Sequence, residues 1–202
     1  MSPVKRLAAE WQKLRYYSEL SEVGEIARRY FAMNAFDGIL TITGVLAGSF
    51  AAHVAEPAVI ATTGLSTAAA MGISGLWGAA LTETAERRRA LNELEQATLS
   101  SLQGTQLAKA SRFAIGVVAL TDALAPVLSA TLVLTPFFFA SELTDLRTAY
   151  LLAFGMAFAM LFALGAFLGA VARQNLVVAG LKTLSAGLLS LGFGLLLHPA
   201  SP

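Results

Sequence analysis

The 202-residue chain is 56% apolar, only 13% of its residues are charged, and its formal net charge is +1. About a quarter of the residues of a soluble domain are usually charged, so this composition argues strongly against a water-soluble cytosolic protein. Intrinsic disorder is excluded because it needs low hydrophobicity and high net charge. The chain has no cysteine, which excludes disulfides, thiolate metal sites and a cysteine nucleophile.

The first predicted element is an amphipathic helix in the N-terminal segment, residues 1–30. Leu7, Trp11 and Leu14 fall on one helical face, a pattern typical of a helix that lies at the membrane interface. Ser21 can cap a second helical piece, because two glutamates follow in its first turn, where the helix dipole favours acids. The same segment is explained equally well as a basic leader, whose Lys and Arg residues only keep the N-terminus on the cytoplasmic side of the membrane.

Five long apolar stretches follow the N-terminal segment. A hydrocarbon core of ~30 Å needs about 20 helical residues at 1.5 Å each, and the stretches meet that length. The predicted spans are residues 31–54, 57–82, 113–139, 148–172 and 174–197. The expected fold class is therefore an all-α integral membrane protein, with a domain of five transmembrane helices over residues 31–197.

The charged loop of residues 83–112 is expected to begin as a helical continuation of the second span. No helix breaker occurs in its first part, and Gly104 is the first plausible stop. Glu83 and Glu86 lie within reach of one face of this helix, because they are three residues apart. Two readings stay open: these acids attract a cation at the cytoplasmic mouth of a path, or they only keep an exposed helix soluble.

The Lys and Arg residues predict the orientation of the spans, because the positive-inside rule counts these residues in short loops. Twelve of the 14 lie before the first span, between the second and third, or between the fourth and fifth, and only Arg147 lies in a loop on the other side. The N-terminus is therefore expected in the cytoplasm and the C-terminus outside. No long soluble domain interrupts the spans, which is compatible with a multi-pass protein of a prokaryotic cell membrane. Cytoplasmic arginines in this setting favour anionic lipid headgroups over nucleic acid as partners.

Three charged residues lie inside the predicted spans: Asp37, Asp122 and Lys182. A charge in hydrocarbon costs about 2.5 to 3.5 kcal/mol on insertion scales and usually marks a pathway or a pair. Counted from Tyr30, Phe113 and Gln174, the three residues are seven, nine and eight positions in from the cytoplasmic side, so each lies roughly 10 to 14 Å along its helix. Two interpretations stay open. In the structural one, Lys182 forms an ion pair with an aspartate or extends to the lipid headgroups. In the functional one, the aspartates line a polar passage and Lys182 tunes their charge.

Asp37 has two potential metal ligands beside it. Met33 and Asn34 precede it by four and three residues, so a thioether, an amide oxygen and a carboxylate share one helical face. Oxygen ligands suit Mn(II) and Fe(II), and a thioether adds softer character, although a methionine on a membrane helix is usually a packing residue. His53 and His198 are isolated and do not extend this set. No enzyme motif stands out, so an enzyme is not expected.

Small residues recur at four-residue spacing on several spans. Examples are Gly44 and Gly48 on the first span and Gly165 and Gly169 on the fourth. Such rows let helix backbones approach closely, either inside one protomer or between two. A first span that carries both a small-residue row and Asp37 could place two copies of the acid across a symmetric interface.

The first span contains the stretch Met33-Asn-Ala-Phe-Asp-Gly-Ile-Leu-Thr-Ile-Thr-Gly-Val-Leu-Ala-Gly. This Asn-x-x-Asp-Gly-type signature, followed by a Gly-rich apolar run, resembles the first transmembrane helix of the vacuolar iron transporter family. The second span contains Met71-Gly-Ile-Ser-Gly-Leu-Trp-Gly and continues as a charged helix, which looks most like the family's prokaryotic, especially archaeal, branch. The resemblance covers about residues 28–197.

The resemblance implies a homodimer that moves Fe(II) or Mn(II) out of the cytosol in exchange for protons. The path would run between the first helices of the two protomers, and no cofactor would be tightly bound. Asp37 matches the family's membrane-embedded acid, and Met71 lies near a methionine of its second span.

The sequence departs from that family in two ways. The family commonly has a Gly-Glu pair in its second span, whereas Gly75 is followed here by Leu76, and Asp122 could replace the missing acid. Better-known members also carry a glutamate-rich cytoplasmic metal-binding domain, where this chain has only a short loop with few glutamates. A non-transporting membrane scaffold or sensor and a transporter of another solute are the alternative hypotheses.

Overall fold

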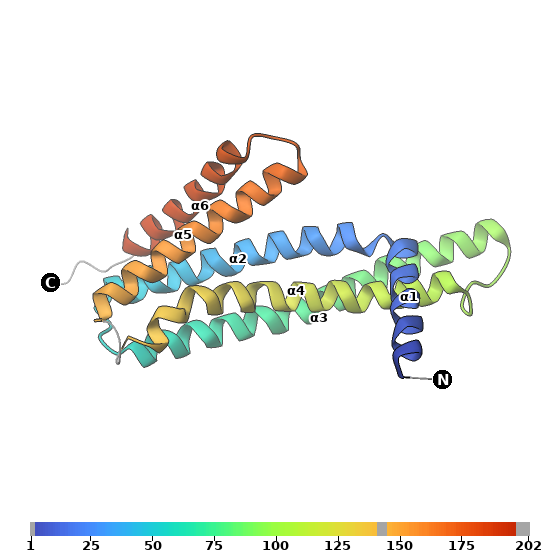
Figure 1. Cartoon of the computed structure of the whole chain (residues 1–202), viewed down its shortest axis with the longest axis horizontal. Helices are drawn as coiled ribbons and strands as arrows, with labels where there is room; N and C mark the ends of the chain where they lie inside the picture. The colour runs from blue at the N-terminus through green and yellow to red at the C-terminus, as the bar shows by residue number, and fades with distance from the viewer. Residues whose placement is uncertain (1–2, 141–144, 197–202) are drawn as a thin grey trace. The chain divides into compact units, whose positions relative to one another are not determined.

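The computed structural model describes residues 3–140 and 145–196, with side chains from residue 11 onward. Within these residues the chain forms six α-helices and no strand (Figure 1). The helices are α1 (Pro3–Ser21), α2 (Val23–Ala51), α3 (Pro57–Thr98), α4 (Gln106–Phe138), α5 (Leu146–Val171) and α6 (Leu176–Leu196). The all-α fold class is confirmed, whereas His198 lies outside the described residues.

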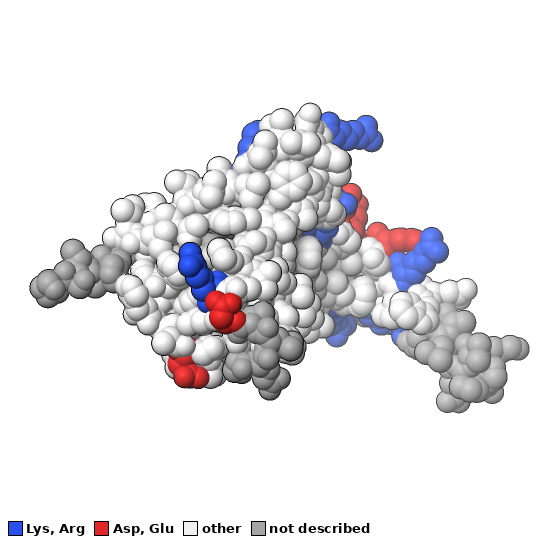
Figure 2. All heavy atoms as spheres, turned by 60° about the vertical axis from the view of Figure 1, so that its left-hand side comes forward, with Lys and Arg blue, Asp and Glu red and all other residues white. Residues whose placement is uncertain are grey.

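Five helices, α2 to α6, are long and apolar enough to cross a membrane. The five apolar stretches therefore do form helices with the length and hydropathy of membrane spans. Figure 2 shows the corresponding surface, on which broad areas carry neither basic nor acidic side chains. The side of the membrane that each terminus faces stays a prediction of the positive-inside rule.

α3 is a single helix of 42 residues that continues well beyond its apolar half. At 1.5 Å per residue it is about 63 Å long, roughly twice the thickness of a hydrocarbon core. The second span therefore does continue into the charged loop, but the helix ends at Thr98 and not near Gly104. Leu99 has a φ of 52°, and the Glu95 carboxylate accepts the N–H of Leu102 at 2.6 Å, so the chain leaves the helix early.

α1 and α2 meet at Glu22, whose φ is 51°. The predicted capping by Ser21 is wrong, because its hydroxyl donates to the carbonyl of Tyr17 inside α1 at 2.6 Å. Tyr17 is buried and packs on Phe113 of α4, with ring centroids 6.2 Å apart. Trp11 remains 69% exposed, and the location of α1 at the membrane interface stays a prediction.

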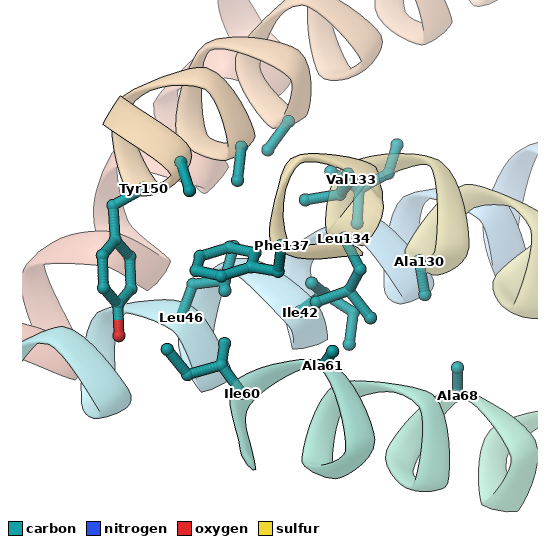
Figure 3. Packing of buried hydrophobic residues seen from close by; sticks show 14 of the residues in the cluster. Ile42, Leu46, Ile60, Ala61, Ala68, Ala130, Val133, Leu134, Phe137 and Tyr150 are labelled. Carbon is teal, nitrogen blue, oxygen red and sulfur yellow. The ribbon is translucent and has the colours of Figure 1, made fainter. Parts of the chain in front are cut away.

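The described helices form two compact units, the first from residues 3–31 and 74–123 and the second from residues 32–73, 124–140 and 145–196. The first unit has a small core of Val23, Ala79, Ala114, Val118 and Ala119. The second has a larger core with side chains from α2, α3, α4 and α5 (Figure 3), among them Ile42, Leu46, Ile60, Leu134 and Phe137. Because lipid is as apolar as these side chains, close packing stabilises the cores more than removal from water does.

α5 and α6 form an antiparallel hairpin in the second unit (Figure 1). Two glycines of α5 permit it: a Cβ at Gly165 would lie 2.7 Å from the Ala179 carbonyl oxygen, and one at Gly169 would lie 2.7 Å from the Ala179 Cβ. Thr183 donates a hydrogen bond across the hairpin to the carbonyl of Leu161 at 2.7 Å. The small-residue row of the fourth span therefore packs inside the chain.

Candidate functional site

Asp37 lies on the outward side of α2, away from the core of the second unit. The residue is exposed, and Met33, one turn earlier, is 54% exposed. Successive helical residues are about 100° apart, which puts Asp37 nearly opposite the buried residues around it, Ala35, Gly38, Ile39 and Ile42. The predicted shared face of Met33 and Asp37 is confirmed, while Asn34 is half-buried at its edge.

The rotation of α2 is set by the glycine that follows Asp37. A Cβ at Gly38 would lie 2.7 Å from the Cα and 2.8 Å from the carbonyl oxygen of Pro126 in α4. These are backbone atoms, so only glycine lets the two helices come this close. Ser129 adds to the contact by donating to the carbonyl of Ala35 at 3.2 Å. With Gly38 seated against α4, the neighbouring Asp37 points away from α4.

Two further glycines, Gly44 and Gly48, follow Asp37 on the same side of α2. A Cβ at Gly48 would meet nothing within 4 Å, and the residue is exposed. Gly44 is partly covered by α6, whose Ser190 hydroxyl donates to the carbonyl of Leu40 at 3.1 Å. The outward side of α2 thus presents an acid and an open small residue.

Asp122 has a different setting, in the first unit. It is only 8% exposed. A Cβ at Gly75 of α3 would lie 2.9 Å from the Asp122 carbonyl oxygen and 3.0 Å from its Oδ2. The carboxyl group of Asp122 therefore lies beside Gly75, one residue before Leu76, where the vacuolar iron transporter pattern has a glutamate. The replacement of that acid by Asp122 stays a prediction, which this proximity favours.

Glu83 belongs to a partly buried polar cluster at the start of the charged half of α3. Its Oε2 lies 3.0 Å from Nε of Arg87, and the side chains of Glu83 and Arg87 are 13% and 15% exposed. The Tyr30 hydroxyl of α2 also donates to Glu83, at 3.5 Å. Glu86 is exposed, so it is the more accessible of the two acids to a cation.

Sequence reasoning missed Arg87 and Tyr30 as partners of Glu83. Arg87 could have been found, because residues four apart on a helix are neighbours. Tyr30 could not, since it is 53 residues from Glu83 in the chain and only the packing of α2 on α3 brings them together.

Lys182 is exposed on α6 and forms no salt bridge with Asp37 of the same unit. The hydrogen bond from Ser190 to Leu40 sets the register of the parallel helices α6 and α2. Lys182 precedes this contact by eight residues on α6, whereas Asp37 precedes it by three on α2. The ion-pair reading therefore gains no support for Asp37. Three salt bridges join side chains four apart on one helix: Arg15–Glu19, Glu83–Arg87 and Arg89–Glu93.

Among the described residues, no three His, Cys, Asp or Glu side chains gather as a metal site. At Asp37 one chain offers a carboxylate, the Met33 thioether and the Asn34 amide, and Met71 is half-buried on α3. Mn(II) and Fe(II) prefer several oxygen ligands. A metal ion at Asp37 would therefore need ligands from more than one copy of the chain.

Five helices able to cross a membrane, with an acid on the outward side of one of them, define a multi-pass helical membrane protein. The chain is similar to the uncharacterized protein MJ0645 of Methanocaldococcus jannaschii, with 30% identity over 168 residues, which cover 82% of this chain and 85% of that protein. The chain therefore belongs to the family of that archaeal protein. No protein-family model matches the chain, and no solved structure matches it.

Proposed function

We propose that the protein is a divalent metal cation transporter that works as a homodimer and moves Fe(II) or Mn(II) out of the cytosol in exchange for protons. The observation that carries the proposal is the exposed acid Asp37 in the apolar helix α2. A charge that faces lipid costs about 2.5 to 3.5 kcal/mol on insertion scales, so a partner surface is favoured there. A second copy of the same helix supplies it.

A two-fold axis at the outward side of α2 brings two copies of Asp37 together. Gly48 is open on that side and lets the two backbones approach closely. Each copy adds the thioether of Met33 and the amide of Asn34 to the carboxylate. The paired set of two carboxylates, two amides and two thioethers suits Fe(II) or Mn(II).

The paired carboxylates also offer a physical route to exchange. Two carboxylates that share a site repel each other, and either a divalent cation or protons relieve the repulsion. Protons that enter the site therefore displace the cation, and the cation displaces protons. Transport in one direction is then coupled to proton movement in the other.

The acids of the first unit have separate roles in this proposal. Glu86 is exposed and collects cations on the basic side of the membrane. Glu83, which Arg87 holds in an ion pair, contributes less to cation capture. Asp122, buried beside Gly75, takes the part of the acid that the second span lacks.

Two comparisons support the proposal. Residues 33–48 resemble the first transmembrane helix of the vacuolar iron transporter family, in which Asp37 matches the membrane-embedded acid. The archaeal relative agrees with residence in a prokaryotic cell membrane.

Reconstituted vesicles with an internal metal-sensitive dye test the proposal. The wild-type chain should carry Fe(II) or Mn(II), and both Asp37→Ala and the isosteric Asp37→Asn should abolish the flux, because each removes the carboxylate. Glu19→Gln is the matched control: it removes an exposed acid of α1 and should leave the flux unchanged. Unchanged flux in both Asp37 variants would overturn the assignment.

The same vesicles distinguish the alternative functions. An internal pH-sensitive dye should report protons moving against the metal, and metal flux without proton movement would contradict exchange. A wild type that moves another solute of a test panel but no metal is a transporter of that solute. A wild type that moves none of them fits a scaffold or sensor.

A further inference from the structure

A cavity of about 620 Å³ lies in the first unit, between the charged half of α3 and the start of α4. It has the size of a small-molecule site, and the proposed transport path does not use it. Its polar lining comes from both helices, with Thr84, Arg87, Arg88 and Asn92 on α3 and Ser111 and Arg112 on α4.

The cavity carries positive charge that the described chain does not neutralise. Its acid, Glu95, accepts the backbone N–H of Leu102 at 2.6 Å, and its single negative charge offsets only one guanidinium charge. Arg87 is engaged in an ion pair on its own helix. Arg88 and Arg112 are exposed and form no salt bridge within residues 11–140 and 145–196. Arg112 donates through Nε to the Ala108 carbonyl at 3.4 Å, so its two terminal nitrogens and the guanidinium group of Arg88 are available to an anion.

A buried hydroxyl faces the same cavity. Ser111 is only 9% exposed and lines the cavity. A serine or threonine inside a helix commonly bonds to the carbonyl four residues back, as Thr121 does with Val117 at 2.8 Å in the same helix. The Ser111 hydroxyl makes no hydrogen bond in the part of the chain that the structure describes. Its O–H is thus available to a ligand next to Arg112.

The position of the cavity along the helices indicates the kind of anion. The apolar stretch of α3 ends at Thr82 and that of α4 begins at Phe113. Thr84, Ser111 and Arg112 therefore lie within one helical turn of the edge of the hydrocarbon core. The headgroup layer is about 5 to 7 Å thick on each side of that core, so the end of the cavity at Thr84, Ser111 and Arg112 lies at the depth of the lipid phosphates, and the rest of its polar lining lies farther from the core.

We propose that this cavity binds the phosphate group of an anionic phospholipid on the basic side of the membrane. The guanidinium groups of Arg88 and Arg112 bind phosphate oxygens, whose geometry they match, and the Ser111 hydroxyl donates a further hydrogen bond. Ile115, two residues inside the apolar stretch of α4, forms an apolar wall at the core-side end of the cavity and contacts the glycerol and first methylene groups. This apolar wall favours a lipid over a soluble phosphate compound.

Titration calorimetry of the full chain in a neutral maltoside detergent tests the proposal, with dioctanoyl phosphatidylglycerol as the probe. Arg88→Gln combined with Arg112→Gln should weaken binding at least about tenfold, because charge-assisted hydrogen bonds to phosphate are lost. Arg147→Gln combined with Arg173→Gln is the matched control. It removes the same charge from exposed positions of the second unit and should leave the affinity within about twofold.

Ser111→Ala tests the site without changing its charge. This variant should bind the lipid about threefold more weakly, with an unchanged melting temperature, since the hydroxyl bonds to no described group. Equal affinities of the two arginine double variants would overturn the site. If inorganic phosphate binds as tightly as the lipid, the choice of a lipid is overturned. If dioctanoyl phosphatidylcholine binds as tightly as dioctanoyl phosphatidylglycerol, the requirement for net negative charge is overturned.

Discussion

Replacement of Gly38 by alanine tests the contact that turns Asp37 outward. The added Cβ would lie 2.7 Å from the Cα and 2.8 Å from the carbonyl oxygen of Pro126, and it would overlap the Ser129 hydroxyl. Non-bonded carbon atoms pack best about 3.5 to 4.0 Å apart, so α2 and α4 have to separate by about 1 Å. Ser129 then loses its 3.2 Å hydrogen bond to the carbonyl of Ala35.

We expect Gly38→Ala to lower the free energy of unfolding by about 2 to 4 kcal/mol. Overpacking of a close contact costs about 1 to 3 kcal/mol, and a hydrogen bond between membrane helices contributes about 0.6 kcal/mol. A chain of this size loses about 2 to 4 °C of melting temperature for each kcal/mol, which gives a decrease of roughly 5 to 15 °C.

Thermal unfolding of the detergent-purified chain measures the effect of Gly38→Ala. Gly116→Ala in α4 is the matched control, because a Cβ there meets nothing within 4 Å, and its melting temperature should stay within about 2 °C of the wild type. The metal flux of Gly38→Ala should also fall, since the direction of Asp37 changes although no ligand is removed. Equal melting temperatures for the two alanine variants would refute the close contact.

Three further predictions concern the dimer, the polar cluster and the N-terminal helix. Because the chain has no cysteine, Gly48→Cys introduces a single thiol. Mild oxidation should link two copies, since a disulfide forms when the two Cα atoms are about 4.4 to 6.8 Å apart. An unlinked chain would contradict this interface. Glu83→Gln should lower the unfolding free energy by about 1 to 3 kcal/mol, because its arginine partner stays partly buried. Glu86→Gln should change it by less than about 0.5 kcal/mol, and equal effects in thermal unfolding would argue against the cluster. In Trp77→Phe, the remaining Trp11 should be quenched by lipids brominated near the headgroup, and an unquenched signal would place α1 in water.

The spans could be predicted from the sequence because apolar length is a local property of the chain. The helix ends were predicted less well. α3 stops at Thr98 because Glu95 accepts the N–H of Leu102, a contact that no breaker residue signals. The Ser21 hydroxyl donates to the carbonyl of Tyr17 in α1, so a residue type that is common at helix N-termini does not cap α2 here.

The candidate site was predictable where it depends on one helix. The shared face of Met33 and Asp37 follows from their four-residue spacing, because side chains at that spacing lie above one another. The pairing of Tyr30 with Glu83 and the approach of Gly75 to Asp122 join separate helices. Neither contact has a local pattern from which it could be inferred.

By itself, the sequence determined that the chain belongs in a membrane, how often it crosses, and which charged residues interrupt the spans, because these follow from composition and helical period. The tertiary structure decided where each helical face points. Gly165 faces α6 inside the chain, whereas Asp37 faces outward because Gly38 packs against Pro126. The arginine-lined cavity likewise exists only where α3 and α4 meet. These features depend on contacts between residues far apart in the chain, which local spacing does not specify.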